Sequence, residues 1–341
     1  MVSLGTRSTT LTNLLKGLGF DLKVIRVWDI HQGFQSVVQM LSQLNREGHL
    51  RHRDILFIDG NRQITSMFLW DTEGIYDVKA HMIDFRDAEK TKKQINHFVA
   101  DKMHKRTKEF ITSLNPHTFL FLVNYVFFKG IWEMAFHTHL MYKENFFVDE
   151  HTTVQVDMMW KTEQMIYSRS EELFATMVKI PYIGNMSIVL MLPDVGKPDP
   201  AIKDMIVQKA TLLKSSDMRN GSQLPPTCRQ PWRELASLPR AALGRLGMRP
   251  DLCFSRLSEL TPRAETGPAS PQAMHEATME VSKEGKMDAL KDVNSDNVIP
   301  LHTHTAAPLV VKFNRPFFLL VEDWMTQRAL LMGKVFNPTA E

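Results

Sequence analysis

The chain has 341 residues, of which 43% are hydrophobic, with 41 basic against 38 acidic residues. This length and hydrophobic content allow a sizeable core, and the near balance of charge gives no reason to expect a nucleic-acid partner. The longest apolar run, residues 119–128, is about half of the roughly 20 residues that a membrane-spanning helix needs. Two cysteines, Cys228 and Cys253, exclude a disulfide framework and a four-cysteine zinc site, and the sequence does not say whether they pair.

Hydrophobic spacing predicts helices and strands in order along the first third of the chain. Apolar residues three and four apart predict a short helix that ends near Gly19, a second helix over residues 34–44 and a third over residues 87–103. Residues 50–59 predict a strand that ends in a turn. Residues 118–128 are apolar on both faces, which is typical of the central strand of a sheet that is covered on both sides.

Two hairpins, over residues 177–193 and 316–336, flank a segment of different composition. Residues 221–271 hold eight of the seventeen prolines of the chain. Because proline removes hydrogen-bond donors from strands and breaks helices, we expect no continuous strand there. A short helical pattern over residues 241–248 is the exception.

Four stretches are similar to sequences of the serpin family. Residues 123–136, VNYVFFKGIWEMAF, resemble the family's central strand and the turn after it, and residues 313–339 resemble its C-terminal signature. Residues 3–22 resemble the end of helix B and helix C of that family, and residues 90–99 resemble helix F. The chain is therefore identified as similar to serpins, most of all to the alpha-1-antitrypsin group, also called clade A.

The resemblance implies one α+β domain over residues 1–341, with three β-sheets and eight or nine helices. Compared with the family, helix A and part of helix B are missing, and the stretch near 214–272 is irregular. The family's members are secreted serine-protease inhibitors rather than enzymes and need no cofactor or metal. In their mechanism a protease cleaves an exposed reactive-centre loop, here residues 281–310, which then inserts as a new strand into the largest sheet and traps the protease.

The start of this loop departs from the family pattern. Serpin inhibitors follow the Glu and Gly at this point, here Glu284 and Gly285, with small uncharged residues, since alternate side chains enter the sheet. The inward-facing positions here are Lys286, Asp288, Leu290 and Asp292. Burying an unpaired charge costs several kcal/mol, so three charges among these four positions oppose insertion and put inhibitory activity in doubt.

The family's spacing places the scissile bond at Ile299–Pro300. A proline directly after the cleaved bond resists most serine proteases, and the register of this long loop is ambiguous. The target protease therefore cannot be named from the sequence.

Three residues match positions that stabilise the sheet in the family, namely His275, Asn124 and Trp132. The hydroxyl partner of the family's histidine has no counterpart here, so we expect His275 to be an unpaired imidazole at a cost of about 1–3 kcal/mol. Asn185 and Asn220 each begin an Asn-X-Ser sequon and are candidate glycosylation sites.

Basic residues and histidines gather at two further places. Arg46, Arg51 and Arg53 could form a weak heparin patch, but a solvated strand edge is the favoured interpretation. The pairs His137/His139 and His302/His304 could meet at a metal, but solvated loop histidines are favoured. We expect no metal site.

The resemblance leaves three functions open. The first is a monomeric extracellular serpin with a serine protease as partner, although no signal peptide is readable at the N-terminus. The second is a non-inhibitory carrier of a small hydrophobic ligand, and the third is a pseudogene-like product without function. We expect no nucleic-acid or membrane partner.

Overall fold

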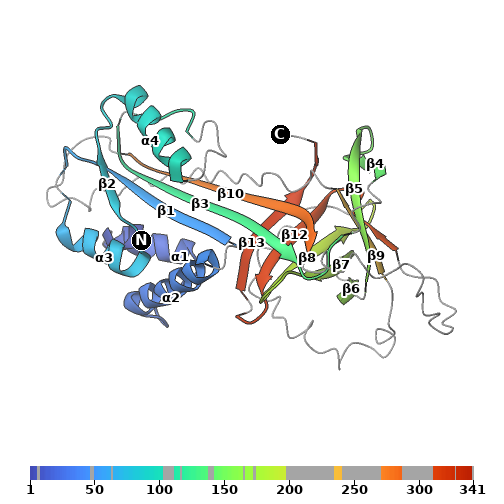
Figure 1. Ribbon diagram of the computed structural model, residues 1–341. Helices are drawn as coiled ribbons and strands as arrows, with labels where there is room; N and C mark the ends of the chain where they lie inside the picture. Colours follow the sequence, from blue (N-terminus) through green and yellow to red (C-terminus); the bar gives the residue numbers. More distant parts are fainter. Residues whose placement is uncertain are drawn as a thin grey trace, which may run out of the picture. The chain divides into compact units, whose positions relative to one another are not determined.

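The computed structural model describes most of the chain (Figure 1). The described residues are 1–5, 8–46, 50–62, 64–102, 111–115, 117–136, 142–163, 166–171, 174–196, 234–239, 270–285, 310–326 and 328–339. They belong to two compact units, one of residues 1–127 and 247–277, the other of residues 128–246 and 278–341.

The helices of the described residues all lie in the first unit. They are the 3-10 helix η1 (Val2–Gly5) and the α-helices α1 (Ser8–Gly17), α2 (Val27–Arg46), α3 (Ser66–Tyr76) and α4 (Ala88–Lys102). The three helices predicted from periodicity are confirmed, and Gly19 has the positive φ of +84° expected just beyond a helix end. None of the helices in the described part of the chain is long and apolar enough to cross a membrane.

The strands form three sheets. The four-stranded sheet has the order β10 (Ser270–Gly285), β3 (Thr118–Trp132), β1 (Leu50–Asp59) and β2 (Ala80–Ile83). A second four-stranded sheet has the order β11 (Val310–Lys312), β9 (Glu234–Pro239), β5 (Thr153–Glu163) and β4 (Tyr142–Phe147). The five-stranded sheet has the order β13 (Arg328–Val335), β12 (Phe317–Asp323), β8 (Met186–Pro193), β7 (Ala175–Pro181) and β6 (Ile166–Ser170).

In the first unit, β3 lies inside its sheet and both of its faces are covered, as predicted. Phe121, Val123 and Tyr125 pack on one side with Ile95 and Val99 of α4. The neighbouring cluster contains Leu120 of β3 together with Leu56 and Ile58 of β1 and Phe68 and Ile75 of α3. Figure 1 shows α4 on one side of these strands and α1, α2 and α3 on the other.

In the second unit, both predicted hairpins are confirmed. β7 and β8 are antiparallel with Ile180 opposite Ile188, and Gly184 in their turn has a φ of +88° that only glycine adopts freely. β12 and β13 are antiparallel, with Phe317 opposite Val335, and β12 also pairs with β8. The two hairpins therefore form one continuous sheet.

Strand β9 corrects the expectation that residues 221–271 contain no continuous strand. Glu234–Pro239 pairs with β5 on one side and with β11 on the other. The prolines of this stretch flank the strand at Pro231 and at its last residue, so the five residues from Glu234 to Leu238 keep the N–H donors that a ladder needs.

Candidate functional site in the four-stranded sheet

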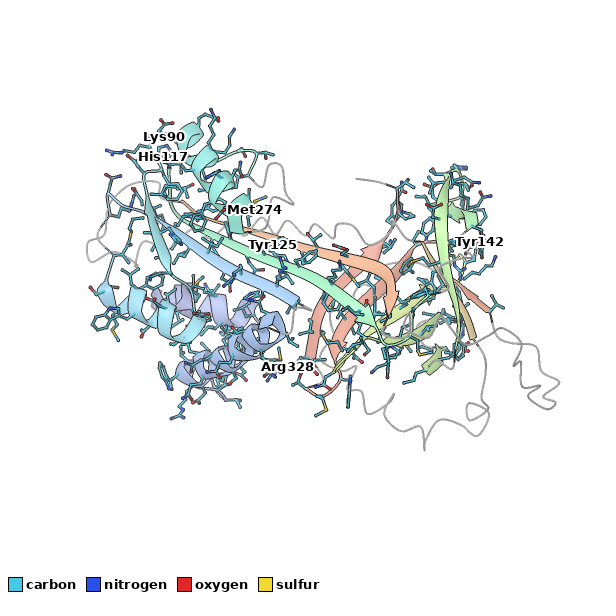
Figure 2. All side chains as sticks on the ribbon, in the orientation of Figure 1. Lys90, His117, Tyr125, Tyr142, Met274 and Arg328 are labelled. Atoms are coloured by element: carbon cyan, nitrogen blue, oxygen red, sulfur yellow. The ribbon has the colours of Figure 1, made fainter. Side chains whose placement is uncertain are left out.

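Four polar side chains meet inside the four-stranded sheet of the first unit. His52 and Asp54 come from β1, Asn124 from β3 and His275 from β10. We call these four residues the polar cluster. Figure 2 labels Tyr125 and Met274, the chain neighbours of Asn124 and His275, which pack in one hydrophobic cluster and mark the position.

Asn124 is the centre of the polar cluster. Its Nδ2 donates a hydrogen bond of 2.6 Å to Asp54 Oδ1 and lies 3.1 Å from His52 Nε2. His52 Nε2 lies 3.3 Å from Asp54 Oδ2. The carboxamide oxygen of Asn124 faces Nδ1 of His275, so Nδ1–H of that imidazole donates to it.

The expectation that His275 is an unpaired imidazole is therefore wrong. A carboxamide has one acceptor oxygen and two N–H donors, so Asn124 can accept from His275 and donate to Asp54 at the same time. Asn124 therefore partners His275, although the family's hydroxyl has no counterpart in this sequence.

Burial and these contacts shift two pKa values. Burial lowers the pKa of His275 below its usual range, and the nearby charge of Asp54 opposes this only in part. For Asp54 burial raises the pKa, but the hydrogen bonds from His52 and Asn124 and the charge of His52 outweigh it, so its pKa lies below the usual range. At neutral pH the polar cluster therefore holds an Asp54 carboxylate and a neutral His275.

In the second unit, the last part of β3 contacts β10 and β7. Lys129 Nζ forms an ion pair of 2.8 Å with Glu280 of β10. Trp132 is fully buried and stacks on Tyr182, with ring centroids 4.2 Å apart and planes at 17°. A Cβ at Gly130 would lie 2.3 Å from the Tyr182 ring, so only glycine leaves room for that ring. We call Phe128, Gly130, Trp132 and Tyr182 the aromatic corner.

The reactive-centre loop predicted over residues 281–310 starts inside β10 (Ser270–Gly285). Glu284 and Gly285 are the last two residues of that strand. The other predicted loop, sequon, cysteine and histidine-pair positions lie outside the described residues, and they are Lys286, Asp288, Leu290, Asp292, Ile299, Pro300, Asn220, Cys228, Cys253, His137, His139, His302 and His304.

Asn185 lies in the exposed turn between β7 and β8, where its carbonyl accepts the backbone N–H of Trp324. Arg51 and Arg53 are exposed on β1, and Arg46 is the last residue of α2. Within the described ranges, no three His, Cys, Asp or Glu side chains are grouped so as to hold a metal ion. The sequon and the basic patch stay predictions.

Sequence reasoning missed a charged pair in the five-stranded sheet. Lys179 Nζ of β7 donates to Glu322 Oε1 of β12 at 2.5 Å, and Ser187 Oγ of β8 lies 3.3 Å from the same oxygen. The exposed fractions of the two charged side chains are 12% and 8%. The signal in the sequence was a lysine and a glutamate in two strands that are mostly apolar.

Comparison with known proteins gives the family. The family model described as serpin, serine protease inhibitor, matches residues 1–338. The chain belongs to the serpin family. Membership of this family of protease inhibitors also confirms that the chain is not an enzyme.

Three relatives and one solved structure show the range of proteins that resemble this serpin. It is 48% identical to uteroferrin-associated basic protein 2 of Sus scrofa, over all of this chain and 79% of that protein. It is 41% identical to uterine milk protein of Ovis aries, over all of this chain and 80% of that protein. It is 33% identical to alpha-1-antiproteinase of Bos taurus, over 99% of this chain and 79% of that protein. Human kallistatin has a TM-score of 0.78 and 25% identity, covering all of this chain and 88% of that one. The predicted serpin fold is thereby confirmed.

Proposed function

We propose that this serpin is non-inhibitory, so that a protease cuts its reactive-centre loop and is not trapped by it. The observation that supports this is the charge at Lys286, Asp288 and Asp292, directly after the end of β10 at Gly285. Insertion would bring these side chains into a sheet interior that is packed with aromatic and aliphatic side chains. Each unpaired charge would oppose insertion by several kcal/mol.

The contacts between β3 and β10 add to this barrier. These two strands are direct neighbours in the sheet of order β10, β3, β1 and β2. A strand that entered between them would replace the Asn124–His275 hydrogen bond in the first unit and the Lys129–Glu280 ion pair in the second. If the loop began with small uncharged residues, their packing inside the sheet could offset that loss. Here Lys286, Asp288 and Asp292 instead add the free-energy cost of burying charge.

The names of two relatives agree with a role other than protease inhibition. The pig relative is named for an association with uteroferrin and the sheep relative for uterine milk, and neither name refers to a protease. By analogy we propose a monomeric extracellular protein that carries glycans on Asn185 and Asn220. Asn185 is exposed in its turn, as a glycan acceptor must be.

Limited proteolysis tests the proposal. The chain is incubated with elastase, chymotrypsin and trypsin, and the melting temperature is measured before and after cleavage of the loop. We expect cleavage without an SDS-stable complex and without a rise in melting temperature, because the loop does not insert. A covalent complex, or a clear rise in melting temperature on cleavage, would contradict the proposal.

Two variants sharpen this test. Replacing Lys286, Asp288 and Asp292 together with alanine should produce a rise in melting temperature after cleavage, because the inward positions then carry no charge. Lys291→Ala is the matched control, since it removes a charge from an outward position of the same loop and should leave the response unchanged. A product without function would instead show no cooperative unfolding transition, either before or after cleavage.

Carriage of a small hydrophobic ligand is the second candidate function. It is favoured by an open cleft of about 820 Å³ in the second unit, a size within the usual range for small-molecule sites. Saturable binding of a small apolar compound to the intact chain would support it. This candidate and the non-inhibitory loop are compatible with each other.

A further inference from the structure

The cleft of the second unit lies where four segments meet. They are the hairpin between β4 and β5, the end of β8, residues 314–316 before β12, and the end of β13. The cleft is separate from the polar cluster and from the charged pair of Lys179 and Glu322, none of which lines it.

Three large apolar side chains from different segments line this cleft and are open to solvent. Phe147 is 48% exposed, Val195 81% and Phe336 52%. A single exposed apolar residue is normal on a protein surface, but several at one concave site are typical of a site that binds something apolar. The cleft therefore offers apolar contact for a ligand.

Arg315 places a positive charge in the same cleft. Its Nε and Nη2 donate to the carbonyl oxygen of Pro193 at 3.1 and 3.0 Å. Burial lowers the pKa of Arg315, and the charge of Asp194 opposes this only in part. The Asp194 carboxylate accepts hydrogen bonds of 2.7 and 2.6 Å from Arg169, so it is already held by another guanidinium.

No carboxylate of the described residues accepts a hydrogen bond from Arg315. A guanidinium has five N–H donors in a planar fork, and the Pro193 carbonyl occupies only two of them. A half-buried guanidinium with unused donors is stabilised most by a planar anion, because a carboxylate matches its fork and restores charge balance.

The acidic residues at the rim limit the charge of the ligand. Asp149 Oδ1 accepts the backbone N–H groups of His151 and Thr152 and so caps the hairpin turn. Glu150 is exposed beside it. The ammonium of Lys334, which also lines the cleft, lies over the Phe336 ring, 5.2 Å from its centroid. The two acidic side chains disfavour polyanions such as phosphate esters, whereas a monocarboxylate adds a single charge at the guanidinium.

We propose that this cleft binds a small amphipathic monocarboxylate. The carboxylate contacts the free donors of Arg315, and the apolar body lies against Phe147, Val195 and Phe336. This names a ligand class for the carrier function and rests on that second candidate, and it does not depend on whether the loop inserts.

Isothermal titration of the intact chain with decanoate and with decanol tests the proposal. We expect saturable binding of decanoate, with about tenfold or greater preference over decanol, because a hydrogen bond to a charged group is stronger than one to a neutral group. Arg315→Gln should abolish the preference and leave decanol binding unchanged. Equal affinity of the acid and the alcohol for the unmodified chain would overturn the proposal.

A second pair of variants places the binding in this cleft. Val195→Glu changes a side chain that is 81% exposed, so the fold should be kept, and it should weaken both ligands at least tenfold by placing a charge on the apolar wall. Met325→Glu is the matched control, because Met325 is 60% exposed and does not line the cleft. No saturable binding, or binding that Val195→Glu leaves unchanged, refutes the proposal even if Arg315→Gln fails to fold. Neither result changes the outcome of the proteolysis test.

Discussion

The two halves of strand β3 are held in different ways. In the first unit, Asn124 of β3 joins β1 and β10 through hydrogen bonds to Asp54 and His275. In the second unit, Gly130 and Trp132 of β3 pack against the ring of Tyr182. One strand therefore carries a polar contact at its middle and a close-packed aromatic contact near its end.

The difference matters because the two kinds of contact respond differently to change. Hydrogen bonds between side chains can be exchanged for others, for example with water, and their net contribution is about 1 kcal/mol each. A packed ring tolerates almost no added volume. We therefore expect the polar cluster to respond to pH and to polar substitution, and the aromatic corner to respond to volume.

The largest effect is expected for Gly130→Ala in the aromatic corner. The new Cβ would lie 2.3 Å from two carbons of the Tyr182 ring, which Trp132 and Phe128 hold in place. We expect a loss of about 3 kcal/mol in the free energy of unfolding, measured by urea denaturation. Gly74→Ala is the control, because it lies in α3 with open space around it and should be neutral or slightly stabilising. Equal urea midpoints for the two variants would show that the corner is not close-packed.

A smaller loss is expected for Asn124→Leu in the polar cluster. This change removes the donor to Asp54 and the acceptor for His275, and it leaves both groups without their central partner. We expect a destabilisation of about 2 kcal/mol in urea. Asn145→Leu removes an exposed strand asparagine, bonded to Gln155, and should change stability by less than about 0.5 kcal/mol. If both variants lower the free energy of unfolding by the same amount, the hydrogen bonds of the polar cluster do not stabilise the fold more than an exposed one does.

Removal of the Tyr182 hydroxyl should change the free energy of unfolding by about 1 kcal/mol or less. Unlike the two changes above, it should not lower that free energy. It is buried, and within the described residues it has no hydrogen-bond partner. Tyr182→Phe should therefore be neutral or stabilise the fold, because an unsatisfied buried hydroxyl is removed. Tyr76→Phe is the matched control, since the buried Tyr76 hydroxyl lies 2.7 Å from His31 Nδ1 and its loss should cost about 1 kcal/mol. Destabilisation by Tyr182→Phe would show that this hydroxyl has a partner.

The pH dependence of stability separates the two halves further. The pKa of His275 is lowered in the folded chain, so the unfolded chain binds the proton first and stability falls as the pH falls below about 6.5. The lowered pKa of Asp54 adds a second loss below about pH 3.8, where the unfolded chain is protonated first. His275→Gln should flatten the decline of stability between pH 7 and pH 5, and His97→Gln, an exposed histidine of α4, should not. An unchanged slope for His275→Gln would contradict this assignment.

Much of the fold could be predicted because the relevant patterns are local. The helix that ends at Gly19, the strand that ends at Asp59 and the hairpin around Gly184 each follow from residues close together in the chain. β9 could not be predicted, because its ladder depends on β5 and β11, which are distant in sequence. Composition alone suggested that the prolines around it would prevent a strand.

The candidate site was predicted in part. Asn124, Trp132 and His275 lie in strands β3 and β10. The expectation that His275 has no partner was wrong, and His52 and Asp54 were not recognised as members of the same cluster. His52 and Asp54 precede Asn124 by 72 and 70 positions in the sequence, and they meet it only because β1 and β3 lie side by side. A list of residues does not contain that information.

The sequence by itself determined the family and the charges at Lys286, Asp288 and Asp292, because both are properties of residue identity and spacing along the chain. Only the tertiary structure decided that Asn124 is the hydrogen-bond partner of His275, that Gly130 is required by the Tyr182 ring, and that Arg315 shares a cleft with three exposed apolar side chains. Hydrogen bonding, packing and burial act over a few ångströms, and only the folded chain brings residues so far apart in sequence within that distance.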